Sequence, residues 1–428
     1  MTFIQADARH IPLADQSVHC CITSPPYWGL RDYGTATWEG GDDGCDHKAG
    51  QAASPTSCLG SGPNGRSKVR ENGFVPFRGD CGKCGARRID NQLGLEPTPE
   101  LYVANMVEVF REVSRVLRDD GTCWVNLGDS YNAYNGGAGP SSALSRGAQT
   151  TERPQLSTGF GLQCKTLKPK DLVGIPWRVA FALQADGWYL RSDIIWSKPN
   201  PMPESVTDRP TKAHEHVFLL SKRPRYYYDA EAIREDADKP TRRQKTFRGG
   251  CYTEGKTYDN SYDYTGHAPY SDGEMGAGRN RRTVWEIATQ PYSEAHFATF
   301  PEKLVEPCIL AGCPEAVCTA CGAGWVREVE EQRPSSYVGR DVNWTTSAGR
   351  MRMVDKFNTT KITTGFAPTC TCAAPTTPGT VLDPFCGSGT TVAVARRLGR
   401  HGIGLDISAE YLEMARKRGR VTQGINFQ

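Results

Sequence analysis

Short apolar runs alternate with amphipathic stretches along most of the chain, which is 428 residues long. Runs rich in β-branched and aromatic residues predict strands, and stretches with apolar positions three and four residues apart predict helices. Strands are predicted at residues 3–7, 19–23, 121–127, 189–196, 379–383 and 401–406, and helices at 99–117, 172–184, 392–398 and 409–418. Two further apolar runs, 216–221 and 226–228, predict an antiparallel hairpin that closes the sheet. Strands that alternate with helices in this way specify an α/β fold with a doubly wound, mostly parallel sheet.

The two ends of the chain supply complementary parts of that sheet. Residues 379–406 have the order strand, glycine turn, helix, strand, which is one nucleotide-binding half of a Rossmann-like fold. Only one more helix follows this half, so the remaining strands must come from the N-terminal part of the chain. The sequence therefore predicts a circularly permuted order of motifs.

The composition indicates the cellular compartment of the protein but does not indicate its function. No apolar run approaches the roughly 18 residues needed to cross a bilayer, and residues 1–15 lack the basic-then-apolar pattern of a signal peptide. We therefore expect a cytoplasmic protein with no membrane partner. Thiols stay reduced there, so the 16 cysteines predict metal ligands and buried thiols rather than disulfides. The net charge of +3 leaves the binding partner open.

The glycine turn near the C-terminus has the chemistry of a nucleoside site. It reads Asp383-Pro-Phe-Cys-Gly-Ser-Gly-Thr-Thr391, and glycine lets a backbone approach a ligand closely. Asp406 ends the next strand, where an acid can accept hydrogen bonds from both ribose hydroxyls of an adenosine. The turn and the acid together favour nucleoside binding over a purely structural turn.

A second motif, Ser24-Pro-Pro-Tyr-Trp28, follows an apolar strand and so is predicted at the carboxyl edge of the sheet, where ligands of this architecture bind. An exocyclic amine is a poor nucleophile because its lone pair is delocalised into the ring, so a catalyst must accept its hydrogens as the nitrogen pyramidalises. The hydroxyl of Ser24 and the carbonyl of Pro25 are suitable acceptors, and Tyr27 offers a flat face for a base taken out of the helix. Ser-Pro-Pro alone would equally suit a structural turn.

Together the two motifs resemble the catalytic and cofactor motifs of the amino-DNA methyltransferases, and their order resembles the β group of that family. The resemblance includes residues 296–304, which precede the glycine turn, and it implies a Rossmann-like DNA methyltransferase with S-adenosylmethionine as cofactor and double-stranded DNA as partner. The cofactor pocket that it implies is lined by Asp7, Phe300, Pro301, Asp383, Phe385, Gly387, Gly389, Thr390 and Asp406. The residues that it implies around the target base are Ser24, Pro25, Pro26 and Tyr27.

The first residue of the catalytic tetrad indicates the target base. Adenine-specific relatives usually carry Asp at this place and cytosine-N4 relatives usually carry Ser, so Ser24 favours N4 of cytosine, with N6 of adenine as the alternative. Glutamine and ribosomal-RNA methyltransferases of similar fold more typically carry Asn there and keep the unpermuted order. Methylation at C5 of cytosine needs a cysteine nucleophile, and the candidate Cys308 falls in a predicted helix ahead of the cofactor turn.

Two pairs of cysteines at chelating spacing predict a structural zinc site. Cys318 and Cys321 are separated by two residues, and Cys370 and Cys372 by one. The polar insertion between the pairs is of the kind that a zinc ribbon closes. Four protein ligands would leave no open coordination position, which indicates a structural rather than a catalytic ion.

A second zinc site is suggested in the stretch that follows the catalytic loop. Cys45 and His47 would supply two ligands, and Cys81 and Cys84 the other two. Cys58 is an alternative to the histidine. Such a site would organise a segment that has no periodic pattern of its own.

We expect three parts in the chain. They are a catalytic part at 1–228 with a zinc-binding insertion at about 34–90, a target-recognition region at 229–285, and a cofactor-binding part at 286–428 with a zinc-ribbon insertion at about 313–376. Basic residues at 239–248 and at Arg279, Arg281 and Arg282 would contact DNA phosphates. A rival interpretation is a zinc-dependent nucleic-acid-binding protein without chemistry. A homodimer is compatible with the sequence, and no nuclease motif is evident.

Overall fold

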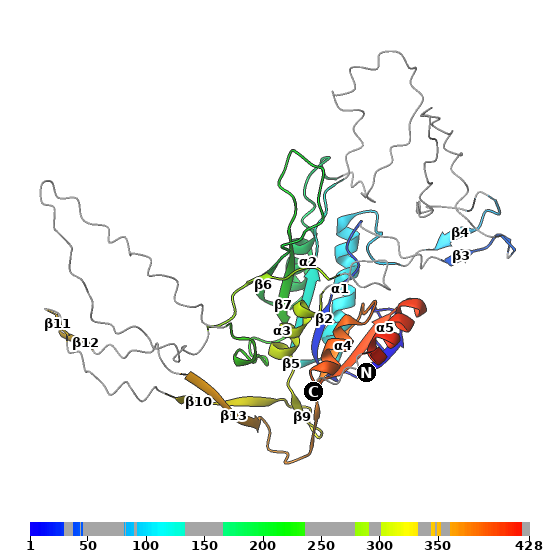
Figure 1. The fold of residues 1–428 in the computed structure, drawn as a ribbon. Helices are drawn as coiled ribbons and strands as arrows, with labels where there is room; N and C mark the ends of the chain where they lie inside the picture. The colour runs from blue at the N-terminus through cyan, green and yellow to red at the C-terminus, as the bar shows by residue number, and fades with distance from the viewer. Residues whose placement is uncertain are drawn as a thin grey trace, which may run out of the picture.

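The computed structural model describes residues 1–29, 37–42, 44–45, 81, 83–89, 92–132, 166–235, 279–290, 301–332, 344–346, 349–351 and 360–421. Eight strands in this part of the chain form one sheet in the order β1-β16-β15-β2-β5-β7-β6-β8 (Figure 1). Their bounds are β1 Thr2–Gln5, β2 Val18–Thr23, β5 Leu117–Leu127, β6 Tyr189–Ser197, β7 His214–Ser221, β8 Val284–Glu286, β15 Thr380–Asp383 and β16 His401–Asp406.

The strands from β1 to β5 in this order pair in parallel. β7 is antiparallel to both of its neighbours, and β6 and β8 pair in parallel at the far edge. The two C-terminal strands, β16 and β15, therefore lie between β1 and β2 from the N-terminal part of the chain. This arrangement confirms the Rossmann-like, circularly permuted fold that the sequence predicts.

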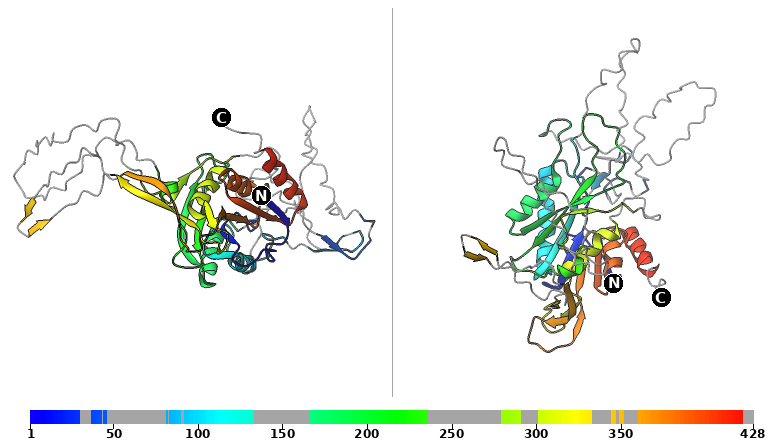
Figure 2. Two further views of the ribbon diagram at one scale, coloured as in Figure 1. Left: turned by 90° about the horizontal axis from the view of Figure 1, so that it is seen from below. Right: turned by 60° about the vertical axis from the view of Figure 1, so that its left-hand side comes forward.

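Helices cover both faces of the sheet (Figures 1 and 2). α1 (Pro99–Val116) and α2 (Ile175–Ala185) pack on one face in a single apolar cluster. α3 (Glu302–Gly312) and α4 (Thr390–Arg397) pack on the other, and α5 (Ala409–Val421) lies beside α4 next to β1. The sheet is thus the middle of three layers, which leaves its edges as the places where a ligand can reach the ends of the strands. No helix among the described residues is long and apolar enough to span a membrane.

Helix α1 shows how the sequence sets these elements. The side chain of Thr98 accepts a hydrogen bond from the backbone of Leu101 at 3.2 Å, and Pro99 occupies the first turn, where a missing N–H costs nothing. Its buried residues recur three and four positions apart and face the sheet: Tyr102, Met106, Val109, Phe110, Val113 and Val116. The predicted range 99–117 is therefore confirmed almost to the residue.

The predicted closing hairpin has a different partner in the structure. β7 pairs with β6 on one side and with β5 on the other, so it has no free edge for residues 226–228. Those residues instead cross the end of the sheet, where the Tyr227 amide donates to the carbonyl of Asp120 at 2.8 Å. The prediction of a hairpin with 226–228 was wrong because a run of tyrosines does not reveal that both edges of a neighbouring strand are already paired.

Small two-stranded ribbons lie outside the main sheet. β9 (Ala316–Cys318) pairs with β14 (Thr376–Pro378), and β10 (Trp325–Gln332) pairs with β13 (Thr360–Pro368). The β10–β13 ribbon extends away from the sheet (Figure 1). The remaining pairs are β11 (Trp344–Thr346) with β12 (Gly349–Met351) and β3 (Thr37–Glu39) with β4 (Arg87–Ile89), and one short 3-10 turn, η2, covers Glu231–Ile233. Because β9 and β14 pair directly, the insertion between them leaves and rejoins the core at one place.

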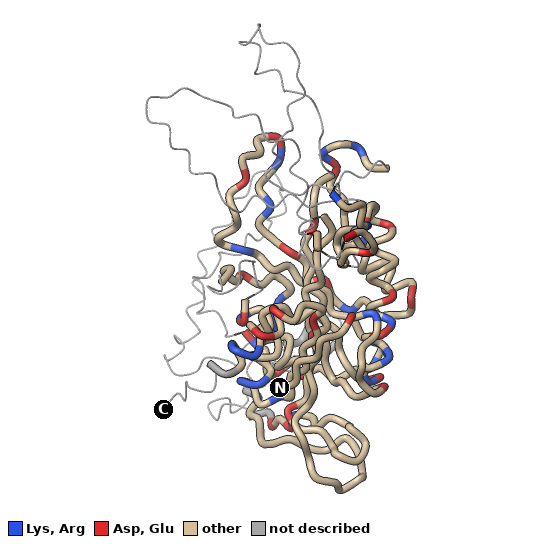
Figure 3. The backbone as a smooth tube through the Cα atoms, turned by 90° about the vertical axis from the view of Figure 1, so that its right-hand side faces the viewer, with Lys and Arg blue, Asp and Glu red and all other residues tan. Residues whose placement is uncertain are grey.

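Charges of both signs are mixed along the described chain (Figure 3). Arg279 and Arg282 both pair with Glu235 at 2.9 Å, so two of the three arginines of the predicted phosphate-binding cluster at 279–282 already have an acidic partner. The small net charge is thus not concentrated in that cluster. A DNA-binding face has to be located by other criteria.

Candidate active site

The predicted catalytic and cofactor residues meet at one edge of the sheet, where the parallel strands end. Ser24 follows β2, Asp383 ends β15 and Asp406 ends β16, and these three strands are neighbours. Asn126 lies near the end of β5. β7 runs the other way, so Glu215 near its beginning reaches the same edge. The topology therefore places the nucleoside-type turn and the Ser-Pro-Pro-Tyr loop side by side.

The glycine turn has a backbone shape that requires glycine. Gly387 and Gly389 have φ angles of 46° and 78°, in the left-handed region that other residues avoid. A Cβ atom on Gly389 would also lie 2.8 Å from the Cβ of Ala415, so α5 can pack against the turn only if this residue is glycine. Gly389 caps α4, whose free N–H groups carry partial positive charge at this edge.

Asp406 is tied to the turn that it faces. Its Oδ2 accepts from the amide of Gly387 at 3.0 Å and its Oδ1 from the amide of Ser408 at 2.9 Å. Burial raises its pKa above the ordinary value for aspartate. Each oxygen keeps a lone pair beyond these contacts, so the carboxylate can still accept two hydroxyl groups.

Asp7 lies two residues beyond the end of β1, the strand next to β16, and is paired with Arg9. Arg9 donates to both of its oxygens, with the shortest contact at 2.6 Å, and this pairing outweighs burial and holds the pKa of Asp7 below its ordinary value. An open cavity of about 570 Å³ is lined by Asp7, Arg9, His10, Glu108 and Arg111. Asp7 therefore borders open space one strand away from Asp406.

Asp383 lies behind the open edge and connects the two motifs. It is fully buried, and its two oxygens accept from the hydroxyls of Thr23 and Thr391, each at 2.7 Å. The amide of Phe385 donates to it at 3.1 Å. Thr23 directly precedes Ser24, so this carboxyl fixes the start of the catalytic loop against the start of α4.

The free energy of unfolding should depend on the protonation of Asp383. Burial raises its pKa to about 6, against 3.8 in an unfolded chain, so between these values the folded protein keeps a proton that the unfolded chain has lost. The resulting stabilisation is complete below about pH 4 and is lost as the pH rises through 6, a change of at most about 3 kcal/mol. We expect urea unfolding from pH 4 to 7 to show a smaller dependence on pH for Asp383→Asn than for the wild type. Asp15→Asn, at an exposed site, should keep the wild-type dependence, and equal slopes for all three proteins would contradict this assignment.

The Ser-Pro-Pro-Tyr loop is held rigidly from behind. Trp28 is buried and its indole N–H donates to the carbonyl of Glu96 at 2.9 Å, while the hydroxyl of Tyr102 donates to the carbonyl of Pro26 at 3.0 Å. Gly94 has a φ of 93°, and a Cβ there would lie 2.9 Å from the carbonyl oxygen of Tyr27. No donor from the described residues reaches the carbonyl of Pro25. That carbonyl remains available to a substrate.

Tyr27 belongs to a network of hydrogen-bonded polar side chains. Its hydroxyl donates to Glu215 Oε2 at 2.7 Å and accepts from the hydroxyl of Ser24 at 3.0 Å and from Asn126 Nδ2 at 2.7 Å. Asn126 Nδ2 also donates to Glu215 Oε2 at 2.9 Å, and Lys198 Nζ pairs with Glu215 Oε1. Burial raises the pKa of Tyr27 far above its ordinary value, so the phenol stays protonated. Ser24 and Tyr27 are therefore joined to a nearly buried ion pair.

The sequence did not single out Asn126, Lys198 or Glu215. Asn126 could have been identified from the sequence, because a polar residue at the end of a parallel strand next to β2 is expected at the edge where ligands bind. Glu215 and Lys198 could not have been identified in this way, because their positions depend on β7 running antiparallel and on β6 ending opposite the start of β7.

The other residues predicted to line the cofactor pocket differ in their burial and contacts. Phe385 is partly buried beside the apolar cluster of α1 and α2. Thr390 is buried and its hydroxyl accepts from Arg418 at 2.8 Å, and Pro301 caps α3. Phe300, which the resemblance places in the cofactor pocket, lies outside the described residues, as do His47, Cys58 and the basic stretch 239–248.

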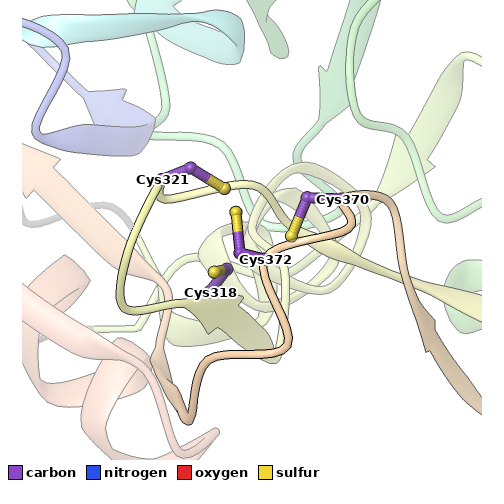
Figure 4. Close-up of side chains that lie close together, drawn as sticks. All are labelled: Cys318, Cys321, Cys370 and Cys372. Carbon is purple, nitrogen blue, oxygen red and sulfur yellow. The ribbon is translucent and has the colours of Figure 1, made fainter.

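Four cysteines come together at the base of the β10–β13 ribbon (Figure 4). The sulfur atoms of Cys318, Cys321, Cys370 and Cys372 all lie within 4.8 Å of one another. Tetrahedral zinc with bonds of about 2.3 Å needs sulfur atoms about 3.8 Å apart, so the spacing fits.

The surroundings of these thiols also suit a cation. Amides of Cys321 and Ala320 donate to the sulfur of Cys318 and lower its pKa to about 7. Hydrogen bonding with the neighbouring thiols, Cys321 first, raises the pKa of Cys372 to about 12, and a bound cation would reverse this effect because metal ligation requires the thiolate.

A second cluster holds three of its four predicted members. The sulfur atoms of Cys45, Cys81 and Cys84 also lie within 4.8 Å of one another, near the antiparallel pair of β3 and β4 in the sequence. A Cβ on Gly41 would lie 2.7 Å from the sulfur of Cys84, so the chain closes tightly around this cluster. Three thiols leave one tetrahedral position for a further ligand.

Comparison with known proteins adds a family to this geometry. The family model described as DNA methylase, which covers N6 and N4 methyltransferases, matches residues 18–322 and 373–417. The unmatched stretch, 323–372, lies within the insertion that the four cysteines close. Both the Ser-Pro-Pro-Tyr loop and the glycine turn lie inside the match.

Two similar relatives match most of their length to this chain. Type II methyltransferase M.Cfr9I of Citrobacter freundii is 38% identical over 347 residues, which are 80% of this chain and 83% of that protein. Type II methyltransferase M.SmaI of Serratia marcescens is 33% identical over 417 residues, which are 97% of this chain and 89% of that protein. Among solved structures, PvuII DNA methyltransferase (cytosine-N4-specific) is a loose match, at 14% identity and a TM-score of 0.45 over 97% of this chain and 85% of that one.

Proposed function

This chain belongs to the DNA methylase family, which makes it an S-adenosylmethionine-dependent DNA methyltransferase of the N4-cytosine or N6-adenine type, and we propose that its target is the exocyclic N4 of cytosine in double-stranded DNA. The observation that carries the choice of cytosine is Ser24 at the head of the catalytic tetrad. A hydroxyl whose hydrogen is already donated to Tyr27 presents lone pairs only, which is what an amine with two N–H groups requires.

The chain provides separate places for the methyl donor and the base. The donor supplies an electrophilic methyl group, and its ribose would be held by Asp406 beside the glycine turn, with Asp7 one strand away. Ser24 Oγ and the Pro25 carbonyl would accept the two hydrogens of the amine. Tyr27 would stack on the base, and stacking offsets part of the few kcal/mol that unpairing costs. Its ring can reach this place because residue 128 is glycine, where a Cβ would lie 2.6 Å from the ring.

We also propose that the division into three parts follows the sequence expectation. Residues 229–285 would read the target sequence, although β8 at 284–286 completes the sheet and so ends that region. The printed names of M.Cfr9I and M.SmaI are those of Type II methyltransferases. By analogy this chain would be the modification enzyme of a restriction-modification system.

We further propose structural zinc in the four-cysteine cluster, and a second ion at Cys45, Cys81 and Cys84 with His47 as the fourth ligand. The first ion would fix the place where the insertion leaves the core, since Cys318 is paired with Thr376 across β9 and β14. His19 donates to the carbonyl of Gly322 at 3.1 Å, so the same turn is bound to β2. Neither ion would take part in catalysis.

The zinc proposal predicts a stoichiometric loss. Protein purified without chelators should contain zinc, and Cys372→Ser should contain one equivalent less per chain and unfold at lower temperature, because metal binding stabilises the folded state directly. Thr371→Ser, between two ligands, is the matched control and should keep the wild-type zinc content. Elemental analysis of both variants checks this, and an unchanged zinc content in Cys372→Ser would rule out the site.

The proposed target is tested by expressing the protein in a bacterial host that lacks DNA methylation. Single-molecule sequencing of its genomic DNA should then show N4-methylcytosine at one short sequence motif. N6-methyladenine at such a motif would keep the enzyme and replace the target. Unmodified DNA, with protein that nevertheless binds duplex DNA, would favour the non-catalytic alternative.

A further inference from the structure

A nearly buried ion pair stands at the end of the polar network of the catalytic loop. The side chains of Lys198 and Glu215 are only 19% and 14% exposed, and the ammonium also lies 4.4 Å from the centre of the Trp196 ring. Burial alone would raise the pKa of Glu215, but Lys198, Tyr27 and Asn126 together hold it below the ordinary value for glutamate. Glu215 is therefore a carboxylate, with no hydrogen of its own to donate.

That single fact determines the direction of every hydrogen bond in the network. The phenol of Tyr27 has one hydrogen, and it must go to Glu215, because a carboxylate can only accept. The oxygen of Tyr27 is then an acceptor for Ser24 and Asn126. The one hydrogen of the Ser24 hydroxyl is thereby committed to Tyr27, while Asn126 Nδ2 faces the same oxygen at 3.5 Å, so Ser24 has only a lone pair left for a substrate.

We infer, on the basis of the proposed function, that Glu215 is a positioning residue. Through Tyr27 it makes Ser24 an obligate hydrogen-bond acceptor. An obligate acceptor at this place selects an amino group over an oxo group on the flipped base. A hydroxyl with a free hydrogen can donate as well as accept, and would suit a carbonyl oxygen equally well. An amino base offers hydrogens, whereas its deaminated counterpart offers a lone pair at the same place. A fixed acceptor pairs with the first and repels the second.

Asn126 is consistent with this arrangement. Its Nδ2 faces Glu215 Oε2, Tyr27 Oη and, at 3.5 Å, Ser24 Oγ, so the carboxylate also determines which end of the amide points into the network. Its Oδ1 is buried and has no partner among the described residues. The network thus presents acceptors, and no free donor, on the side of Ser24.

The test is Glu215→Gln, which keeps the shape but adds a donor. The new amide can donate to Tyr27, which frees the phenol hydrogen for Ser24 and lets Ser24 donate toward the base. We expect kcat to fall about 10²- to 10³-fold, the range for loss of one preorganised polar contact, while the Kd for S-adenosylmethionine changes less than threefold. Glu286→Gln, an exposed carboxylate on β8, should have the wild-type kcat.

Two readouts separate this role from a merely structural one. First, wild-type protein should bind duplex DNA more weakly when the target base is replaced by its deaminated form, uracil for cytosine or hypoxanthine for adenine. The ratio of the affinities for these two DNAs should be at least fivefold smaller in Glu215→Gln than in the wild type. Second, Glu215→Gln should have no further effect on kcat in a Ser24→Ala background, because Glu215 acts through Ser24.

If Glu215→Gln does not fold, Tyr27→Phe is the second variant, since it breaks the same chain of hydrogen bonds and leaves the ion pair intact. It should lower kcat and narrow the preference in the same way. Wild-type turnover in either folded variant, an unchanged preference, or effects that multiply with Ser24→Ala would each overturn the inference. Failure of the proposed function looks different, because the wild-type protein itself would then transfer no methyl group to DNA.

Discussion

Replacing Ser24 by alanine should lower kcat at least about 100-fold while the Kd for S-adenosylmethionine stays within a factor of two. The loss is expected because Ser24 is the first acceptor for the amine hydrogens, and they must be accepted as the nitrogen turns toward the methyl group. Donor affinity should persist because Asp406 and the glycine turn lie on β15 and β16, and none of their hydrogen bonds involves Ser24.

Steady-state kinetics with labelled donor, together with calorimetric titration of the same preparation, checks both halves of this prediction. Ser17→Ala is the matched control, since Ser17 precedes the same strand at the opposite edge of the sheet and its hydroxyl donates to the nearby carbonyl of Ala14. Its kcat should equal that of the wild type. Normal methylation by Ser24→Ala would show that another group accepts the amine.

Replacing Asp406 by alanine should weaken binding of S-adenosylmethionine about 100-fold or more. Two charge-assisted hydrogen bonds to the ribose would be lost, and each is worth about 1.5 to 3 kcal/mol. The turn would also lose the acceptor for the Gly387 amide, which helps to hold its shape. DNA binding should remain, because the catalytic loop is fixed separately by Trp28 and Tyr102.

Equilibrium titration with S-adenosylmethionine measures this effect without any need for turnover. Glu410→Ala, in the first turn of α5, removes an exposed acid only four residues away and should leave the Kd unchanged. An Asp406→Ala variant with wild-type affinity would place the donor elsewhere on the molecule.

The parts of the fold that were predictable are those with a local signal. Helix α1 has a capping threonine, a proline in its first turn and a regular apolar face, so its bounds could be predicted from the sequence almost to the residue. The permuted order was predictable as well, because a nucleotide-binding half at the C-terminus has too few strands to form a sheet alone. The partner of β7 was not predictable, since strand pairing depends on which edges remain free after the sheet has formed.

The site divides in the same way. Ser24 to Tyr27 and the glycine turn carry motifs that can be recognised at short range, and the two cysteine pairs of the ribbon carry a metal spacing. Glu215 and Lys198 carry no motif, and they meet Tyr27 only because an antiparallel strand returns to the carboxyl edge. Asp383 belongs to the recognisable cofactor motif, but its hydrogen bond from Thr23 could not be predicted, because it depends on β2 and β15 lying side by side.

The proposed function depends on one chemical event, the transfer of a methyl group to an exocyclic amine of DNA. Purified protein should therefore be incubated with duplex DNA and isotopically labelled S-adenosylmethionine, and the nucleosides analysed by mass spectrometry. We expect labelled N4-methylcytosine, formed by the wild type and absent with Ser24→Ala. Label in 5-methylcytosine, or no label in any nucleoside although the donor binds, would contradict the proposed function.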